Sequence, residues 1–360
     1  MLLGLTSLFA DWLYEGARAA LPQYMKALGA SALAVGLIFG VGDSLGYLLR
    51  FATGPLADRR GGYWGETFAG YALQVAAIAG LAFAPWLGVV AALVMLERAS
   101  KALRTPARDA IISAAGGGRQ SLAFGLHASL DQIGAVLGSL TSLLLLAVGL
   151  PYSRLFLLLA LPGLAALGFL ALAYRQGVKP TRSERRRGVL RRPLVLFAAS
   201  QFLFGASLMH ISLEMYEMPG AAWMGSAVYL AAMAFEIPAS LAWGRLYESA
   251  RWSLYLGPAA AFLATSAFSA GGLALGVAGA LAYSTATSYA DIIAKARAVE
   301  LEGAARATAL GLVNAAFGLG YLASGGLYGY LIDINAMRLS PVFSALFAVA
   351  SIAIVAAARR

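Results

Sequence analysis

The feature that most constrains the fold of this chain is a basic run in its middle, residues 175–192. Eight of its eighteen residues are Lys or Arg, and Glu184 is its only acid. Each ionised side chain at the centre of a bilayer costs about 2.5–3.5 kcal/mol on insertion scales, so this run cannot lie in hydrocarbon. Apolar sequence of similar length flanks it at 1–174 and 193–360. We therefore expect two apolar domains joined by a solvated, cytoplasmic linker.

The composition of the two flanking regions is that of a membrane protein. Hydrophobic residues make up 60% of the chain and charged residues 12%, whereas about 25% of the residues in soluble domains are charged. The net charge of +10 would also suit a nucleic-acid partner. We expect no such partner, because the basic residues fall in short connections between apolar segments. The chain has no cysteine, which excludes disulfides and thiolate sites.

Each region contains six segments long enough to span a membrane, which takes about 20 mostly apolar residues. The segments lie near residues 3–24, 33–53, 63–83, 86–108, 121–148 and 153–174, and near 193–216, 222–243, 252–270, 272–291, 307–330 and 338–357. We predict an all-α polytopic membrane protein with 12 transmembrane helices in two pseudo-symmetric six-helix bundles.

The distribution of basic residues predicts the orientation in the membrane. Of the 27 Lys and Arg, all but four (Arg18, Lys26, Arg154 and Arg338) lie at connections or ends that alternating spans place on one side. An excess of Lys and Arg marks the cytoplasmic side. We expect both termini to be cytoplasmic and the protein to lie in the cell (inner) membrane.

The first span carries three charged residues on one helical face. Asp11, Glu15 and Arg18 are spaced i, i+4 and i+7, so this segment is a mature helix and not a cleavable signal. Ionisable groups inside a membrane normally face a bundle interior or a wet cavity. They either neutralise one another or form a proton or substrate pathway, and we place Asp43 of the second span in the same pathway.

The two histidines of the chain each lie one helical turn from a carboxylate. His127 precedes Asp131, and His210 precedes Glu214, by four residues. An unperturbed imidazole titrates near ~6.5, so such a pair can carry protons, although a buried histidine is often only a packing residue.

Two further polar residues complete the predicted pathway. Glu236 lies within a span, two residues before Pro238. Asn314 lies among glycines whose pattern repeats that of residues 125–134, 186 positions earlier.

A short motif occurs at matching places in the two regions. Gly54, Leu56 and Asp58 correspond to Gly244, Leu246 and Glu248 at a constant offset of 190 positions. An internal repeat of this kind is typical of secondary transporters. We expect residues 54–62 to form a loop.

The string G-P-L-A-D-R-R-G-G at 54–62 resembles the G-x-L-A-D-R-x-G-R/K signature between the second and third helices of the major facilitator superfamily. Gly62 stands where a basic residue is common. Arg98 resembles the arginine of that superfamily's fourth helix, although Ala102 replaces the usual glycine. Residues 103–110 look like a segment of bacterial drug-efflux-type members.

The resemblance covers nearly the full chain and implies an inner gate held by charged contacts. The gating residues it implies are Gly54, Asp58, Arg59, Arg98, Gly244 and Glu248. We interpret Lys101, Arg104 and Arg119 as interfacial anchors.

These patterns do not indicate an enzyme. The sequence lacks a G-x-x-x-x-G-K-[ST] phosphate loop and an H-E-x-x-H zinc motif, and we expect no cofactor and no bound metal. We predict a monomeric secondary active transporter that moves a small molecule across the lipid bilayer by alternating access, with proton-coupled efflux (antiport).

In this hypothesis Asp11, Glu15 and Asp43 exchange protons, and the pair of residues 127 and 131 completes the path. Arg18 would keep a neighbouring carboxylate ionised. One alternative is a divalent metal ion exporter, since the same acids and histidines are suitable donors. Another is a non-transporting membrane sensor or a lipid scramblase, in which the acids serve assembly alone.

Overall fold

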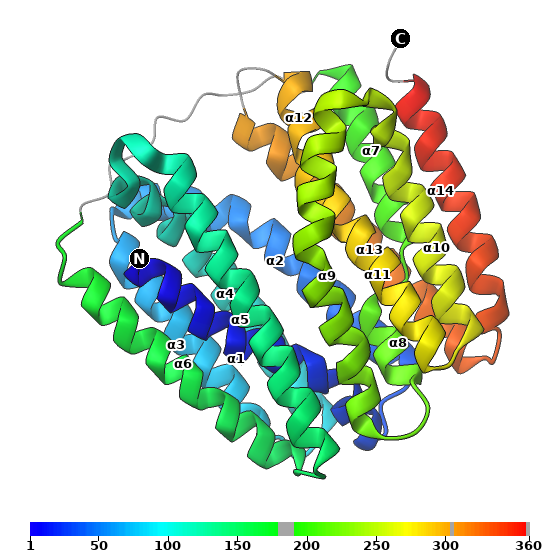
Figure 1. Ribbon diagram of the computed structural model, residues 1–360, viewed down its shortest axis with the longest axis horizontal. Coiled ribbons are helices and arrows are strands. Elements are labelled where there is room, and N and C mark those ends of the chain that lie inside the picture. Colours follow the sequence, from blue (N-terminus) through cyan, green and yellow to red (C-terminus); the bar gives the residue numbers. More distant parts are fainter. Residues whose placement is uncertain (179–190, 303–305, 358–360) are drawn as a thin grey trace. The chain divides into compact units, whose positions relative to one another are not determined.

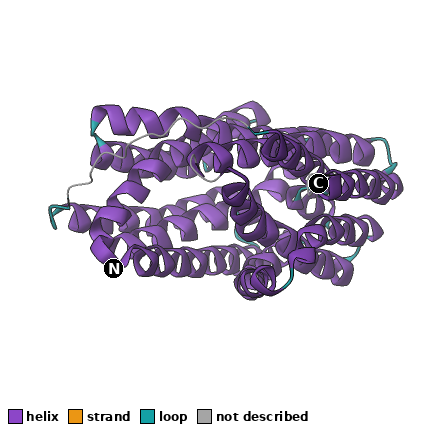
Figure 2. Cartoon of the chain, turned by 90° about the horizontal axis from the view of Figure 1, so that it is seen from above, coloured by secondary structure: helices purple, strands orange, loops and turns teal. Residues whose placement is uncertain are grey.

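The computed structural model describes residues 1–178, 191–302 and 306–357. Within these ranges the secondary structure is helical, with no strand (Figure 2). Residues 179–190, which make up most of the predicted linker, lie outside the described part.

The described helices follow the twelve predicted spans closely (Figure 1). The first region contains α1 (Leu2–Ala27), α2 (Ala32–Arg60), α3 (Tyr63–Leu81), α4 (Leu87–Gly116), α5 (Gln120–Ala147) and α6 (Tyr152–Tyr174). The second contains α7 (Arg192–Ser207), α8 (Ile211–Glu217), α9 (Ala222–Ser249), α10 (Leu256–Ala270), α11 (Leu273–Tyr289), α12 (Lys295–Glu302), α13 (Arg306–Asp333) and α14 (Ser340–Ala357).

Within the described residues, seven helical segments are long and apolar enough to cross a membrane. They are Ala32–Leu49, Leu122–Ala147, Tyr152–Tyr174, Arg192–Glu217, Ala222–Ser249, Thr308–Asp333 and Met337–Ala357. Others fall short for identifiable reasons: α1 and α4 carry several charged residues, and α10 and α11 are only 15 and 17 residues long.

Two predicted connections are helical in the structure. The expected loop at 54–62 is wrong, because α2 continues to Arg60 and the chain turns at Gly61, where φ is 67°. Left-handed backbone of this kind favours glycine, so the helix breaker is Gly61 and not the Gly54-Pro55 pair. The predicted connection after residue 291 is also helical, since a π-helical turn, Ala290–Ala294, leads into α12.

The predicted span at 193–216 is not one continuous helix. α7 ends at Ser207 and α8 begins at Ile211, with Leu208 and His210 in extended conformation between them. Hydropathy alone cannot reveal this break, because Arg192–Glu217 as a whole is long and apolar enough to be one span.

The helices pack into two compact units that do not follow the sequence halves strictly. Unit 1 comprises Met1–Gly29, Leu45–Glu184 and Ala221–Ser226, and unit 2 comprises Ala30–Ser44, Arg185–Gly220 and Ala227–Arg360. The first half of α2 therefore packs with unit 2.

In unit 1, glycines bring α1 directly against α5. A Cβ at Gly134 would lie 2.1 Å from the carbonyl oxygen of Leu8, and one at Gly138 would lie 2.3 Å from that of Trp12. The Ser142 hydroxyl donates to the carbonyl of Gly16 at 2.6 Å. Small residues allow helices to approach this closely in membranes, and here they hold the charged face of α1 beside α5.

In unit 2, the first half of α2 lies against α13. A Cβ at Gly36 would lie 2.1 Å from the carbonyl oxygen of Gly325, and one at Gly325 would lie 2.2 Å from that of Gly36. The Asp333 carboxylate accepts from the backbone N–H groups of Ala32 and Leu33 at 2.8 and 3.0 Å. These contacts satisfy two donors that a helix start leaves open and fix the helix segment that carries Asp43.

Candidate functional site

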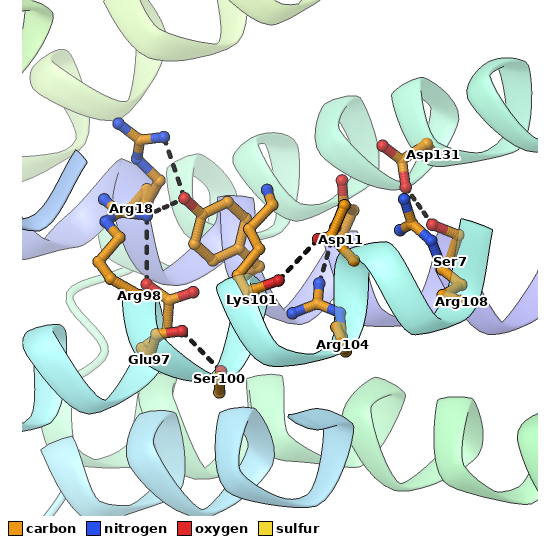
Figure 3. A network of polar contacts seen from close by, with 12 residues as sticks. Ser7, Asp11, Arg18, Glu97, Arg98, Ser100, Lys101, Arg104, Arg108 and Asp131 are labelled. Carbon is orange, nitrogen blue, oxygen red and sulfur yellow. Dashed lines mark hydrogen bonds and ion pairs between the residues drawn. The ribbon is translucent and has the colours of Figure 1, made fainter. Parts of the chain in front are cut away.

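Unit 1 contains a cluster of charged and polar side chains from α1, α4 and α5, which we call the charged cluster (Figure 3). Its α4 members follow helical spacing, so one face of α4 meets the charged face of α1. The charged cluster consists of Ser7, Asp11, Tyr14 and Arg18 of α1, Glu97, Arg98, Lys101, Arg104 and Arg108 of α4, and Asp131 of α5.

Asp11 and Arg104 form a buried ion pair at the middle of the charged cluster. Arg104 Nη2 lies 3.9 Å from Asp11 Oδ1, and the two residues are only 1% and 5% exposed. The guanidinium carbon of Arg104 lies 4.5 Å from the ring centre of Tyr71, a cation–π contact. A Cβ at Gly70 would lie 2.5 Å from the Cβ of Arg104, so glycine makes room for this arginine inside the bundle.

Tyr14 joins the cationic side chains at the other end of the cluster. Its hydroxyl accepts hydrogen bonds from Arg18 Nη1 at 3.1 Å and from Arg98 Nη1. Lys101 Nζ lies 4.0 Å from the centre of the Tyr14 ring. Glu97 lies 3.2 Å from Arg98 Nη1. One aromatic side chain thus gathers three cations, with a carboxylate at the edge of the group.

Asp131 accepts a hydrogen bond from the hydroxyl of Ser7 on α1, and Figure 3 shows Arg108 beside it. His127 is buried one turn earlier on α5, and Glu15 is buried on α1. The face of α5 that carries His127 and Asp131 therefore adjoins α1, and Ser7 is the α1 residue that contacts Asp131.

Sequence reasoning missed most of the α4 side of the charged cluster. Arg104 was expected to anchor at the membrane interface and is instead almost fully buried. The available signal was the recurrence of charged residues at 97, 98, 101, 104 and 108, which places them on one helical face, as in the first span.

Unit 2 contains a second polar site at the break between α7 and α8. His210 Nε2 lies 3.0 Å from Asp43 Oδ2, although the two residues are 167 positions apart. His210 Nδ1 accepts from the backbone N–H of Ser212 at 3.1 Å and so caps the start of α8. The rings of Phe39 and Tyr321 lie 5.5 and 5.2 Å from the imidazole. The structure thus pairs Asp43 with His210.

Hydroxyl groups satisfy the backbone polar groups that the break opens. Thr265 Oγ1 accepts from the N–H of Met209 at 2.9 Å and donates to the carbonyl of Ser207 at 3.0 Å. The other donors to carbonyls of residues 207 and 208 are Ser324 at 2.6 Å, Ser344 at 2.6 Å and Tyr328 at 3.2 Å. Irregular backbone at membrane depth is tolerated when protein groups satisfy it in this way.

A pocket lies within unit 1 among α1, α3 and α4, and we call it the α1–α3–α4 pocket. Its cavity volume is about 10 Å³, which is room for about one water molecule. It is lined by Tyr14, Ala17, Arg18, Leu21, Ala77, Ile78, Leu81, Leu93, Val94, Glu97 and Arg98. One end of this pocket is therefore the Tyr14 end of the charged cluster.

The remaining predicted residues are dispersed. Glu214 is 2% exposed on α8, and Glu236 and Asn314 are half-buried on α9 and α13. Within the described chain, no three His, Asp or Glu side chains gather as a metal site would require.

Only some of the predicted gating residues lie in the part of the chain that the structure describes. Gly54 and the side chains of Asp58 and Arg59 lie outside the described part. At the end of α9, Gly244 is half-buried and Glu248 is exposed. The contacts seen there join Tyr247 and Arg251 to Glu300 of α12, at 2.9 and 2.7 Å.

Proteins of a bacterium and of an archaeon are similar in sequence to this chain. It is 34% identical to an uncharacterized protein of Mycobacterium tuberculosis over 95% of this chain and 88% of that one. It is 31% identical to an uncharacterized MFS-type transporter of Methanocaldococcus jannaschii, over 51% of this chain and 46% of that one.

Solved structures of transporters share the fold. A mutant of the nucleoside transporter NupG matches 98% of both chains with a TM-score of 0.83 at 13% identity. An auto-inhibited POT family peptide transporter matches with a TM-score of 0.80 at 14% identity, over 100% of this chain and 96% of that one. These likenesses confirm the predicted all-α fold of twelve spans in two bundles.

The family model of the Major Facilitator Superfamily matches residues 2–300. The chain therefore belongs to the Major Facilitator Superfamily and is a membrane transporter of that type.

Proposed function

We propose that this protein is a proton-coupled secondary transporter that exports a small molecule by alternating access. It acts as a monomer in the cell membrane, with both termini cytoplasmic. The observation that carries the proposal is the buried Asp11–Arg104 pair inside the charged cluster of unit 1.

The geometry of that pair suits reversible protonation. A direct charge-assisted hydrogen bond spans about 2.7–2.9 Å, whereas Asp11 and Arg104 stand 3.9 Å apart. Burying a charge is costly unless its partner is held closely. A loosely paired, buried carboxylate can therefore take up a proton and release its arginine without breaking a short bond.

The neighbouring groups of Asp11 supply a path for protons. Ser7 lies one helical turn before Asp11 and donates to Asp131, so hydroxyl and carboxylate groups of α1 and α5 adjoin. Acids and histidines that line the interior of a bundle commonly form proton relays.

The direction of transport is supported by sequence resemblance alone. The segment at 103–110 resembles that of drug-efflux-type members, which favours antiport. The nucleoside and peptide transporters that share the fold do so at 13–16% identity, a level that carries no information on the substrate.

Everted membrane vesicles test the proposal. A pH gradient is imposed and followed with a fluorescent amine while aliphatic carboxylates, lipophilic cations and nucleosides are added in turn. An exported compound should release protons and restore the fluorescence. Asp11→Asn should abolish this release, because the amide cannot exchange a proton.

Asp109→Asn is the matched control. Asp109 is a partly exposed carboxylate on α4 that pairs with Arg108 at 2.9 Å, and its neutralisation should leave the proton release intact. Full compound-induced proton release in the Asp11→Asn variant would contradict the proposal. Compound movement that never changes the pH gradient would contradict proton coupling, and absence of any solute flux would favour the sensor or scramblase.

The divalent metal exporter finds no support in the described side chains. The acids and histidines that suggested it divide between α1 with α5 in unit 1 and the His210 site in unit 2.

A further inference from the structure

We propose that His210 is a positioning residue that fastens α2 to the start of α8 while Asp43 is ionised, and that a proton taken up by Asp43 loosens this contact. The place of this step in a transport cycle rests on the proposed function, whereas the proton-dependent contact itself does not.

Two neighbours fix the tautomer of the His210 ring. Nδ1 accepts a hydrogen bond from the backbone N–H of Ser212 at 3.1 Å, so Nδ1 carries no proton. A neutral imidazole has one N–H group, which is then at Nε2. That atom lies 3.0 Å from Asp43 Oδ2, so the ring donates to the carboxylate. One rigid ring therefore joins α2 to the first turn of α8.

Burial favours Asp43 over His210 as the group that exchanges a proton. The His210 side chain is 1% exposed, whereas that of Asp43 is 14% exposed, so water reaches the carboxylate more easily. An ionised Asp43 favours a charged ring, but that ring would be buried and would carry a proton on Nδ1, which ends its bond with Ser212. Protonation of Asp43 removes a charge instead and leaves both ring nitrogens as they are.

The other ionisable side chains around the ring have partners or directions of their own. Tyr321 of α13, whose ring centre lies 5.2 Å from that of the imidazole, donates to the hydroxyl of Tyr283 on α11 at 2.9 Å. Glu214, one turn along α8, faces α11, since a Cβ at Gly276 would lie 2.7 Å from its Oε1. We therefore infer that the charge on Asp43 sets the strength of the contact.

A change in that strength acts on a helix that both units share. The first half of α2 belongs to unit 2 and the rest to unit 1. A hydrogen bond to an ionised acceptor is about twice as strong as one to a neutral acceptor. Asp333 holds the start of α2 at Ala32 and Leu33, so protonation of Asp43 should free the part of this half that lies farther along the helix.

Nuclear magnetic resonance of the full chain in lipid bilayers tests the assigned tautomer. The chain has two histidines, so in the His127→Gln variant every histidine signal comes from His210. Solid-state spectra of isotope-labelled histidine should show a proton on Nε2 and none on Nδ1, from neutral to mildly acidic pH. A proton on Nδ1 in this range would overturn the inference.

Two spin labels measure the contact between the helices. The chain has no cysteine, so Val41→Cys on α2 and Leu263→Cys on α10, both exposed and both in unit 2, place the labels. Acidification should shift the ratio of two label distances about twofold to threefold toward the longer one, because the contact loses about half of its strength. Asp43→Asn should show the acid ratio already at neutral pH, with no further change in acid.

Asp333→Asn is the matched control, because Asp333 is also an acid that holds α2. This variant should keep the full shift on acidification if Asp43 is its source. A shift that persists in Asp43→Asn, or that disappears in Asp333→Asn, would contradict the inference.

Two substitutions of His210 separate the two bonds of its ring. Asparagine is a good helix cap, but its amide is too short to reach Asp43, so His210→Asn should shift the ratio at neutral pH at least as far as acid does. The amide of glutamine extends farther and can donate to Asp43, so His210→Gln should restore the shorter distance. Equal ratios in the two variants would overturn the positioning role.

The outcomes separate this inference from the proposed function. Thermal unfolding shows whether each variant is folded, and the histidine spectra need no substitution at the contact. If the labels responded as expected while Asp11→Asn kept full proton release, only the proposed role of Asp11 would fall. If Asp11→Asn abolished proton release while the label distances ignored pH, only the proton-dependent contact would fall.

Discussion

The two units handle buried polar groups in opposite ways. Unit 1 keeps α1, α4 and α5 continuous and buries full charges between them, as in the Asp11–Arg104 pair. Unit 2 interrupts a helix at residues 208–210 and buries neutral backbone groups, which hydroxyl side chains satisfy. At the same break Asp43 lies beside His210, with its Oδ2 3.0 Å from Nε2.

This difference predicts how much stability each unit loses when one buried partner is removed. Removing one partner in unit 1 leaves a charge without its counterion, whereas removing one hydroxyl in unit 2 leaves a dipole without a partner. The first costs more, because an unpaired charge in a low-dielectric interior has lost more hydration free energy than an unpaired dipole has. Four predictions test this contrast.

The largest expected effect comes from Arg104→Met. Breaking a buried ion pair by removing one member typically costs about 3–5 kcal/mol, because the Asp11 carboxyl would lose this counterion and would either stay ionised without it or take up a proton. Denaturant unfolding of the purified protein measures the change. The double variant Asp11→Asn with Arg104→Met should recover most of the loss.

The exposed pair of Arg251 and Glu300, at 2.7 Å, is the control for that comparison. Arg251→Met should cost no more than about 1 kcal/mol. If the Asp11→Asn, Arg104→Met double variant were as unstable as Arg104→Met alone, the lost stability could not come from the unpaired Asp11.

The next effect concerns the hydroxyls at the helix break. Thr265→Val removes both a donor to the carbonyl of Ser207 and an acceptor for the N–H of Met209. The carbonyl keeps its bonds from Ser344 and Tyr328, so the loss comes from the buried N–H of Met209. Leaving such a donor unsatisfied costs about 1–3 kcal/mol, measured by the same unfolding assay.

Ser351→Ala is the matched control, because Ser351 donates at 2.8 Å to the carbonyl of Ser200, which lies inside the continuous part of α7. That carbonyl keeps its helical hydrogen bond, so the control variant should lose less stability than Thr265→Val. Equal losses would mean that the break places no special demand on its hydroxyl donors.

A smaller effect is expected at the Asp43–His210 contact. A double-mutant cycle with Asp43→Asn and His210→Asn should give a coupling of about 1 kcal/mol, the net value of a typical hydrogen bond. The pair is 3.0 Å apart and Asp43 is partly exposed, so water offsets part of the loss. A coupling as large as that of Asp11 with Arg104 would erase the contrast between the units.

The smallest effect is expected at Glu300, on α12. Burial raises the pKa of this carboxyl, but hydrogen bonds from Arg251, Tyr247 and Arg297 outweigh it and hold the pKa below its ordinary value. A carboxyl with a lowered pKa contributes stability that is fully present above its unfolded pKa of ~4.3 and is lost as the pH falls through the folded pKa.

Glu300→Gln should therefore lower the melting temperature slightly at neutral pH, and its difference from the parent should shrink in strong acid. Thermal unfolding across a pH series measures this. A difference that grows on acidification would contradict the assigned hydrogen bonds.

Seven spans in the described residues could be predicted because hydrophobic length alone defines them, and the others follow from the apolar stretches between short polar connections. The break before His210 could not, since residues 208–210 include no glycine or proline and its hydroxyl donors come from α10, α13 and α14. The extent of α2 was mispredicted because Gly54-Pro55 resembles a turn, while the chain turns only at Gly61.

The candidate site, too, could be predicted only in part from the sequence. The face formed by Asp11 and Arg18 follows from spacing within one helix. Its contacts with Arg104 and Arg98 depend on how α1 meets α4, which the sequence of either helix does not contain. The Asp43–His210 contact joins residues 167 positions apart. It depends on the packing of α2 on α13 and so could not be predicted from the sequence.

The most direct measurement compares two kinds of flux in proteoliposomes that contain the Asp11→Asn variant and a compound shown to release protons. Exchange of labelled for unlabelled compound needs no proton movement, whereas accumulation against a gradient needs a proton-motive force. Our account predicts that the variant keeps exchange and loses pH-driven accumulation. Accumulation at the parent's level would contradict it.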